Sequence, residues 1–288
     1  MSPGRAALGT VTVGDGLPVI AVGVVNLSPE SFHAGSVYGR DDDLLGAALG
    51  MVEEGAALID VGARSTAPYL DTEIDEAEER DRLGRAVELL ARKLPVPISA
   101  DTARAAPARA ALEAGAAVIN DVTGLRDPAV AELVREHGAS VILMASPERG
   151  GPSPPGPPRD PVERVRRLLA AALERARAAG IPEERIVLDP GIGFFRDEGI
   201  PWHEWDARVL AKLGALTRLG RPICVGVSRK SFIGAMTGRH GPEARLPGSL
   251  AATALAVSHG ASVIRTHDTA ETLDAIRDAE RVGRAGAS

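Results

Sequence analysis

Short apolar runs recur along the whole chain and are separated by longer stretches of mixed polarity. The runs are rich in Val and Ile and lie at 19–25, 57–62, 96–101, 117–122, 140–144, 185–190, 222–228 and 262–268. Because polar residues do not alternate regularly within them, they are typical of strands buried on both faces, as in a parallel sheet covered by helices. The pattern therefore predicts an α/β protein with a parallel sheet.

The stretches between these runs have helical periodicity. In 161–179, Val162, Val165, Leu169 and Leu173 recur at spacings of three and four residues, with Arg and Glu on the opposite side. Similar patterns predict helices over 41–54, 74–93, 105–114, 128–137, 205–219, 248–259 and 269–281. Several are followed by a glycine where a left-handed cap is expected: Gly55, Gly115, Gly138, Gly180, Gly220 and Gly260.

The regular alternation of strand and helix predicts a single (β/α)8 TIM barrel over residues 1–288. An open, doubly wound sheet is the alternative. The opening segment 9–20, GTVTVGDGLPVI, predicts a short N-terminal β-hairpin with its turn at 14–16, which would cover the floor of the barrel. Two irregular segments, 145–160 and 195–204, follow the fifth and sixth predicted strands, on the face where barrel enzymes have their active sites.

The composition fits a globular protein, with 44% hydrophobic and 25% charged residues in a chain of 288. A formal net charge of −6 gives no general attraction for nucleic acid, so we expect no nucleic-acid partner. We expect no signal peptide, because the first residues lack a long apolar run, and no membrane association, because no later run is as long as a membrane span. Cys224 is the single cysteine, which favours a cytoplasmic protein.

Polar side chains stand at the ends of most of the predicted strands. Each one alone has an ordinary structural explanation, such as capping the next helix. Barrel geometry, however, brings all strand ends to one mouth, where together they predict a pocket with both carboxylates and cations. The residues concerned are Asn26, Asp101, Asn120, Asp121, Asp189, Arg229, Lys230, Arg265 and His267.

The chemistry of this set indicates a flat ligand with an N–H edge and an anionic group. Ionised aspartates only accept hydrogen bonds, so they suit a donor-rich heterocycle. Arg265 and His267 are two residues apart on one strand and would offer donors to phosphate-type oxygens. Asn26 offers a carbonyl oxygen to Mg²⁺, which commonly bridges to substrate phosphates.

Seven segments carry a more specific resemblance: VGVVNLSPESF, IDVGARSTAP, ISADT, VINDVTGL, IVLDPGIGF, VGVSRKSFIG and SVIRTHD. In this order and at the spacing of barrel repeats, they resemble the signature segments of the dihydropteroate synthase family. The resemblance spans nearly the whole chain. It implies a pterin-binding barrel enzyme of folate biosynthesis, a class targeted by sulfonamides.

The resemblance also implies a reaction in which 6-hydroxymethyl-7,8-dihydropterin diphosphate condenses with 4-aminobenzoate or a related arylamine and diphosphate is released. The implied pterin-binding residues are Asp101, Asn120, Asp189, Met144, Phe194 and Lys230. The implied catalytic residues are Lys230, Arg265, His267 and Asn26, with Asn26 holding the diphosphate through Mg²⁺, the implied cofactor. The arylamine side would be lined by Phe32, Thr66, Pro68 and Ser231.

The departures from the family pattern gather in the first two strand-to-helix loops and on the arylamine side. The usual Glu-Ser-Thr-Arg-Pro is here Arg64-Ser65-Thr66-Ala67-Pro68, so the family's loop arginine is absent unless Arg64 replaces it. Ala34 stands at the position of an aspartate, Ala145 at that of a histidine, and Phe195-Arg196 at that of Gly-Lys. The pattern therefore predicts a retained pterin site and an altered site for the second substrate.

Two alternatives follow from these departures. The chain could be a pterin-dependent methyltransferase acting on a corrinoid protein, although such a transfer needs no diphosphate site and so does not explain Arg265 and His267. It could also be a divergent pterin-binding protein without synthase activity, because Ala34 and Ala67 replace two loop residues. The resemblance further implies a homodimer, for which the apolar helix at 248–259 is a candidate interface.

Overall fold

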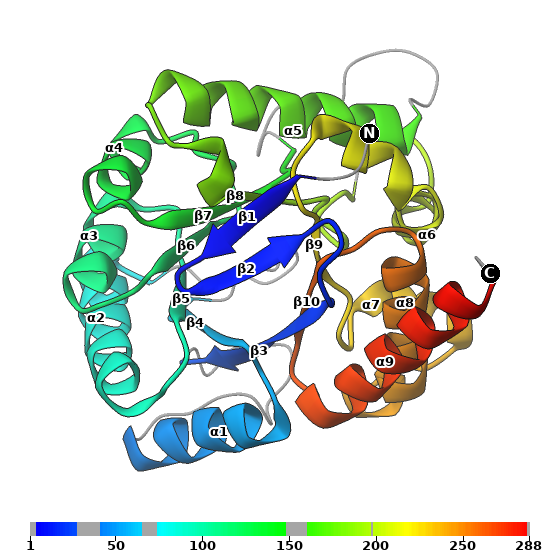
Figure 1. The fold of residues 1–288 in the computed structure, drawn as a ribbon, viewed down its shortest axis with the longest axis horizontal. Helices are drawn as coiled ribbons and strands as arrows, with labels where there is room; N and C mark the ends of the chain where they lie inside the picture. The colour runs from blue at the N-terminus through cyan, green and yellow to red at the C-terminus, as the bar shows by residue number, and fades with distance from the viewer. Residues whose placement is uncertain (1–3, 28–40, 65–73, 148–159, 197, 287–288) are drawn as a thin grey trace.

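Parallel strands form a closed barrel at the centre of the molecule (Figure 1). The computed structural model describes residues 4–27, 41–64, 74–147, 160–196 and 198–286. Within these ranges the eight strands are β3 (Ile20–Asn26), β4 (Leu58–Gly62), β5 (Ile98–Asp101), β6 (Val118–Asp121), β7 (Ser140–Met144), β8 (Ile186–Asp189), β9 (Cys224–Gly226) and β10 (Val263–Thr266).

The barrel is closed by a contact between β8 and β9, the two strands at the ends of the hydrogen-bonded order. Hydrogen-bonded neighbours follow the order β8-β7-β6-β5-β4-β3-β10-β9. A parallel bridge from Leu188 to Ile223, with the Leu188 N–H donating to the Pro222 carbonyl at 3.0 Å, joins β8 to the segment that leads into β9. This closure confirms the predicted (β/α)8 barrel and excludes the open doubly wound alternative.

Helices surround the barrel and cover its outer face (Figure 1). They are α1 (Asp41–Glu54), α2 (Glu76–Lys93), α3 (Ala105–Glu113), α4 (Pro128–Glu136), α5 (Pro161–Ala178), α6 (Trp202–Ala211), α7 (Ser231–Thr237), α8 (Leu246–Ser258) and α9 (Thr269–Ala285). Short 3₁₀ helices, η2 (Glu183–Arg185), η3 (Leu213–Leu219) and η4 (Pro242–Arg245), complete the connections. In the described ranges no helix is both long and apolar enough to cross a membrane.

Two predicted helical features differ from the structure. The predicted helix 205–219 is two elements, because α6 begins at Trp202 and the chain continues from Leu213 as 3₁₀ turns. Helix α7 was not predicted, since its seven residues, SFIGAMT, have too little periodicity to register as a helix. Its position matters because α7 begins directly after Lys230.

A two-stranded hairpin covers the amino-terminal end of the barrel, as predicted (Figure 1). Strands β1 (Arg5–Leu8) and β2 (Val11–Gly14) pair in antiparallel fashion. Leu8 and Val13 belong to one buried cluster with residues from the barrel interior, including Val22, Leu58 and Cys224. The cluster explains the single cysteine as a small core side chain and closes the barrel opposite the candidate site.

The predicted position of the hairpin turn was wrong. Leu8 pairs with Val11, so Gly9 and Thr10 make the turn, and the Gly-Asp-Gly sequence at 14–16 begins with the last residue of the second strand instead. The physical reason is packing, because a Cβ on Gly9, whose φ is +61°, would lie 2.8 Å from Pro97 Cβ on the barrel floor. Only glycine fits there, whereas the first strand, RAAL, has weak β propensity and gave no signal in the sequence.

Candidate active site

The predicted site residues meet at the carboxyl ends of the strands, which we call the mouth of the barrel. Strand register places Asn26, Gly62, Asp101 and Asn120 side by side on β3 to β6. Met144 is likewise paired with Asp189 across β7 and β8. Phe32, Thr66 and Pro68, and also Ala34 and Ala67, lie outside the described residues.

A largely buried arginine at the mouth neutralises two aspartates. The Arg265 Nη2 group on β10 donates to Asp60 Oδ2 on β4 and, at 3.1 Å, to Asp101 Oδ2 on β5. Burial would lower the pKa of Arg265, but the two carboxylates raise it above its ordinary value. Burial raises the pKa of Asp101 to about 7, although Arg265 opposes the shift. The arginine therefore stays charged and allows Asp60 and Asp101 to share a buried position.

Polar atoms around this ion pair lack hydrogen-bond partners within the described chain. They are Asp60 Oδ1, Asp101 Oδ1 and Asn120 Nδ2, all inaccessible to solvent. An unsatisfied buried polar group costs about 1–3 kcal/mol. Asp101 and Asn120 are neighbours in the strand register, so these acceptors and this donor are available to a ligand with a complementary polar edge.

A second charged group lies beside β8. Lys230 is partly buried and donates through Nζ to the Ile192 carbonyl. Burial lowers its pKa, while Asp189 and Asp206 oppose that shift. Burial also raises the pKa of Asp189, whose Oδ1 accepts from the Gly191 N–H at 2.8 Å. Lys230 thus lies between carboxylates, with its charge directed at the turn that follows β8.

Asp206 on α6 supports that turn from below. It is fully buried and accepts the Gly193 N–H at 2.9 Å. A Cβ on Gly193, whose φ is +90°, would lie 3.2 Å from Lys230 Cδ, so the turn also packs closely against the lysine stem. Asp206 therefore fixes the backbone that positions Lys230. The sequence analysis did not identify this residue.

Replacing Asp206 by asparagine is expected to increase stability at high pH and to reduce activity. Burial raises the pKa of Asp206 from 3.8 to about 6, so unfolding releases a proton between these pH values and the folded state loses stability as the pH rises. Above pH 6 this loss is constant at about 3 kcal/mol. Asp206→Asn removes it, so urea unfolding should show the variant more stable by up to this amount at pH 8 and equal to the parent near pH 4.

The control is Asp274→Asn, at an exposed ion pair on α9. It should not change the free energy of unfolding at pH 4 or at pH 8. Equal stabilities of parent and Asp206→Asn at both pH values would contradict the assignment. At pH 8 we expect kcat/KM to fall about tenfold, since Lys230 and Arg196 lose a counter-charge.

The segment after β8 adds a cation and two aromatic contacts beside the start of α7. Arg196 stacks on the Trp202 ring at 4.0 Å and donates to Ser231 Oγ at 3.0 Å. Phe194 lies 5.3 Å from Lys230 Nζ, whereas Phe195 is buried and stacks on Trp205. Phe195 therefore packs in the core, whereas the Arg196 side chain lies at the mouth.

His267 and Arg229 behave differently from each other. His267 Nδ1 lies 3.0 Å from Ser228 Oγ, which fixes the imidazole ring just beyond the end of β10. Arg229 forms a forked ion pair with Asp268 at 2.6 and 2.9 Å and also donates to the Pro242 and Glu243 carbonyls. Arg229 thus holds loops together and is not part of the ligand site.

Asn26 and Met144 border the mouth from opposite walls. Gly62 lies two residues beyond Asp60 and so on the same face of β4. A Cβ on Gly62 would lie 3.4 Å from Asn26 Oδ1. The Asn26 amide oxygen therefore lies on the inner side of the mouth. Met144 is buried, and the Ala145 N–H that follows it donates to the Asp189 carbonyl at 2.8 Å.

Arg64 is held by a buried glutamate on α2. Glu79 accepts from Thr102 Oγ1 at 2.7 Å and from Arg104 Nη1 at 3.1 Å, and Arg64 Nε lies 3.5 Å from it. Arg64 is the last described residue before the second loop. Its charge is neutralised at the wall of the mouth, so a role in place of the loop arginine would require it to leave Glu79.

Arg64→Gln is therefore expected to change stability slightly and substrate binding little. The free energy of unfolding should fall by about 1 kcal/mol, because Glu79 keeps Thr102 and Arg104. The KM for the phosphate-bearing substrate that the sequence predicts should stay within about threefold of the parent value, since a paired cation adds little to phosphate binding. Steady-state kinetics test this directly, and a tenfold rise in KM would instead assign Arg64 the role of the loop arginine.

The principal residue that the sequence analysis missed is Asp60. Its signal was present, since it is the only charged residue in the apolar run ALIDVG at 57–62. A charge inside an otherwise apolar strand requires a buried partner, here Arg265.

Comparison with known proteins identifies the family. The family described as pterin binding enzyme matches residues 22–267. The dihydropteroate synthase of Mycobacterium leprae is 40% identical over 270 residues, which cover 90% of this chain and 92% of the relative. The chain belongs to the dihydropteroate synthase family. It is therefore a transferase of folate biosynthesis, as predicted, and the methyltransferase alternative loses its support.

Solved dihydropteroate synthases have the same fold. The Yersinia pestis enzyme, described in complex with a sulfonamide drug, superposes with a TM-score of 0.87 at 34% identity and covers 98% of this chain and 99% of its own. The Xanthomonas albilineans enzyme, described with 4-aminobenzoic acid, has a TM-score of 0.84 at 36% identity, with 98% of each chain covered. Family membership thus agrees with the barrel and with the position of its mouth.

Proposed function

We propose that this dihydropteroate synthase condenses 6-hydroxymethyl-7,8-dihydropterin diphosphate with 4-aminobenzoate at the mouth, and that Asp60, Asp101, Asn120 and Asp189 hold the pterin. The observation that carries the proposal is the set of buried polar atoms that have no partner in the described chain: Asp60 Oδ1, Asp101 Oδ1 and Asn120 Nδ2. An aminopyrimidine edge presents N–H donors beside ring-nitrogen acceptors. It would satisfy both carboxylate oxygens and the amide at once.

The ring carbonyl and N5 would face Lys230, whose Nζ donates to the Ile192 carbonyl at the edge of the mouth. Met144 and Phe194 would contact the faces of the ring, since one lies on β7 and the other on the turn after β8. Buried apolar contact from both sides and a polar edge below give a flat heterocycle a single orientation.

The reaction needs no nucleophile from the protein. The arylamine nitrogen forms a bond to the exocyclic methylene carbon of the pterin as the bond from that carbon to the diphosphate oxygen breaks. The electron pair leaves with diphosphate, and the amine proton passes to solvent. Arg265, whose Nε has no acceptor among the described residues, and His267 would stabilise the charge that develops on the leaving diphosphate. Holding both substrates in line would supply the rest.

The residues present fit Mg²⁺ held mainly by the substrate. Among the described residues, no group of three or more His, Cys, Asp or Glu side chains could hold a metal ion. Asn26 Oδ1 is a neutral oxygen on the inner side of the mouth, which suits an ion that keeps several waters and bridges to phosphate oxygens. When bound, Mg²⁺ would neutralise part of the diphosphate charge, and Asn26 would orient it.

The arylamine would enter between the turn after β8 and the start of α7. Ser231 Oγ and Arg196 are joined by a 3.0 Å hydrogen bond there, and both can donate to a carboxylate. Phe32, Thr66 and Pro68 would complete this side from the first two loops. The relative described with 4-aminobenzoic acid supports that compound as the second substrate.

The protein would act as a cytoplasmic homodimer in which one barrel spans the chain. Exposed apolar side chains at Met236 on α7 and Leu255 on α8 lie on helices in contact with each other, which supports an interface there. The buried thiol of the single cysteine, Cys224, is consistent with a reducing compartment.

The test is product formation by the purified protein with pterin diphosphate, 4-aminobenzoate and Mg²⁺. The proposal predicts stoichiometric release of diphosphate and dihydropteroate, the product identified by mass. Without 4-aminobenzoate, or with EDTA in place of Mg²⁺, release should fall at least about tenfold. Tight binding of the pterin without any product would support the remaining alternative, a pterin-binding protein that has lost synthase activity.

A further inference from the structure

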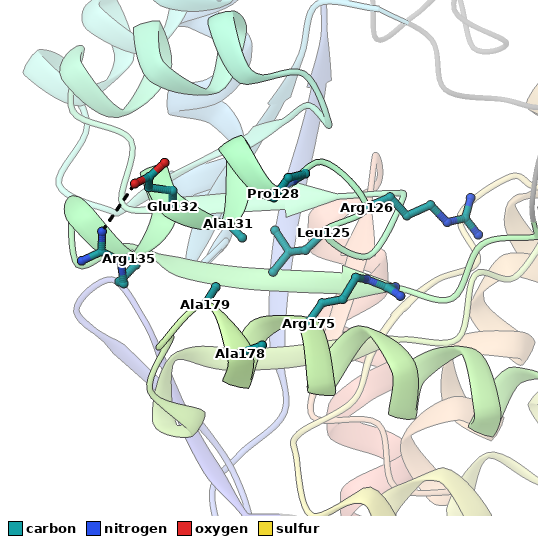
Figure 2. A pocket seen from close by; sticks show the side chains of 9 residues that line it. All are labelled: Leu125, Arg126, Pro128, Ala131, Glu132, Arg135, Arg175, Ala178 and Ala179. Carbon is teal, nitrogen blue, oxygen red and sulfur yellow. Dashed lines mark ion pairs between the residues drawn. The ribbon is translucent and has the colours of Figure 1, made fainter.

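A groove on the outer wall of the barrel, between α4 and α5, lies apart from the mouth (Figure 2). Its volume is about 550 Å³, within the range of about 300–1,000 Å³ that small-molecule sites occupy. The floor is apolar and includes Leu125, Ala131 and Ala179. Arginines stand around it, so the groove combines an apolar surface with positive charge.

The charge is concentrated at one end. Figure 2 shows the Arg126 and Arg175 side chains extending to the same side, whereas Arg135 lies at the opposite end beside Glu132. Arg135 is 3.9 Å from Glu132 and 3.4 Å from Glu136, so its charge is compensated. Within the described chain, neither Arg126 nor Arg175 forms an ion pair. The uncompensated end can therefore accept an anion, and the other end cannot accept a second one.

Arg175 is positioned for a bidentate contact. Its Nε donates to the Gly124 carbonyl at 2.8 Å, which fixes the plane of the guanidinium and leaves both terminal nitrogens without an acceptor in the described residues. Arg126 donates through its own terminal nitrogens to the Ser146 and Pro147 carbonyls at 2.6 and 3.3 Å. Burial and the nearby Arg126 both lower the pKa of Arg175, and the buried Asp121 carboxylate opposes that shift without forming an ion pair with the arginine.

The turn beneath Arg175 is rigid. Asp121 accepts from the Thr123 N–H at 2.6 Å and from the Leu125 N–H at 3.0 Å, and Leu125 has a left-handed φ of +57°. A fixed carbonyl at Gly124 therefore holds a fixed guanidinium. Such preorganisation lowers the entropy cost of binding a ligand.

We propose that this groove is a second ligand site, and that it binds a small aryl carboxylate. The carboxylate would pair with the terminal nitrogens of Arg175, with Arg126 adding positive potential. The aromatic body would lie over Leu125, Ala131 and Ala179. Glu132 at the far end selects a monoanion over a dianion.

The test uses 2-naphthoate as the probe and its neutral amide as the matched ligand. With the intact protein labelled at Ala and Leu methyl groups, NMR titration should shift the Leu125, Ala131 and Ala179 signals with a Kd on the order of 1 mM. The amide should bind at least about tenfold more weakly, because it lacks the charge that Arg175 recognises. This comparison needs no variant and so does not depend on a mutant folding.

Variants locate the site. Arg175→Met should weaken 2-naphthoate binding at least about tenfold, whereas Arg135→Gln, at the compensated end, should leave both binding and turnover unchanged. Lys230→Met, at the mouth, should also leave this binding unchanged. Equal affinity for the acid and the amide, shifts that avoid the three groove residues, or loss of binding in Lys230→Met would each overturn the proposal.

Discussion

Replacing Arg265 by methionine is expected to lower kcat/KM severely and to destabilise the fold more at pH 8 than at pH 5. The substitution leaves Asp60 and Asp101 buried without their shared cation. Removing one partner of a buried ion pair costs about 3–5 kcal/mol. The pKa of Asp101 is already raised to about 7 by burial, and without Arg265 it rises further. At pH 5 this carboxyl is therefore protonated, and part of the cost disappears.

Two measurements check this result. Urea unfolding followed by circular dichroism at both pH values should show the larger loss at pH 8, and kcat/KM should fall by about 10³-fold. Arg265→Lys is the matched variant, because it keeps the charge but loses the fork; it should recover most of the stability and little of the activity. Equal stability losses at pH 5 and pH 8 would show that Arg265 acts through packing alone.

Replacing Trp205 by alanine is expected to cause a large loss of stability at a position outside the mouth. Trp205 is buried and stacks on Phe195 with ring centroids 5.1 Å apart. Truncating a buried tryptophan costs about 3–5 kcal/mol, because the surrounding core cannot fill the cavity. Asp206 follows directly in the chain and supports the turn that carries Gly193, so activity should fall as well.

The control is the same substitution three residues earlier. Trp202 is only partly buried and stacks on Arg196, so Trp202→Ala should lower the free energy of unfolding by about 1 kcal/mol or less. Its effect should appear instead in the KM for 4-aminobenzoate, because Arg196 then loses its support beside Ser231. Thermal unfolding and steady-state kinetics of both variants separate the two roles, and equal losses of stability would contradict the division between them.

The barrel could be predicted from the sequence because its signals are local and repeated. Apolar runs, amphipathic helices and Gly caps alternate from the first strand to the last, and Gly55, Gly115 and Gly260 have the expected left-handed conformation. The position of the hairpin turn was predicted wrongly because it depends on a contact between residues distant in the sequence. Gly9 is required by contact with Pro97, a residue far away in the sequence, and local turn propensity favoured 14–16 instead.

The sequence predicted the site residues that lie at strand ends. It did not predict those that reach the site from the surrounding helices. Asp101, Asn120, Asp189 and Arg265 follow from barrel topology, which places strand ends together. Asp206 lies within a helix, and only the three-dimensional structure brings it to Gly193. The pairing of Arg64 with Glu79 likewise joins the end of β4 to α2, a contact that no sequence spacing specifies.

The central claim is that the buried polar atoms at the mouth bind the aminopyrimidine edge of the pterin. A crystal structure of the protein with pteroic acid tests this most directly. The account predicts hydrogen bonds from the pterin to Asp60 Oδ1, Asp101, Asn120 and Asp189, with the ion pair between Asp60 Oδ2 and Arg265 unchanged and the aryl carboxylate beside Ser231. A pterin bound elsewhere, or one bound at the mouth that leaves Asp101 Oδ1 and Asn120 Nδ2 without partners, would contradict it.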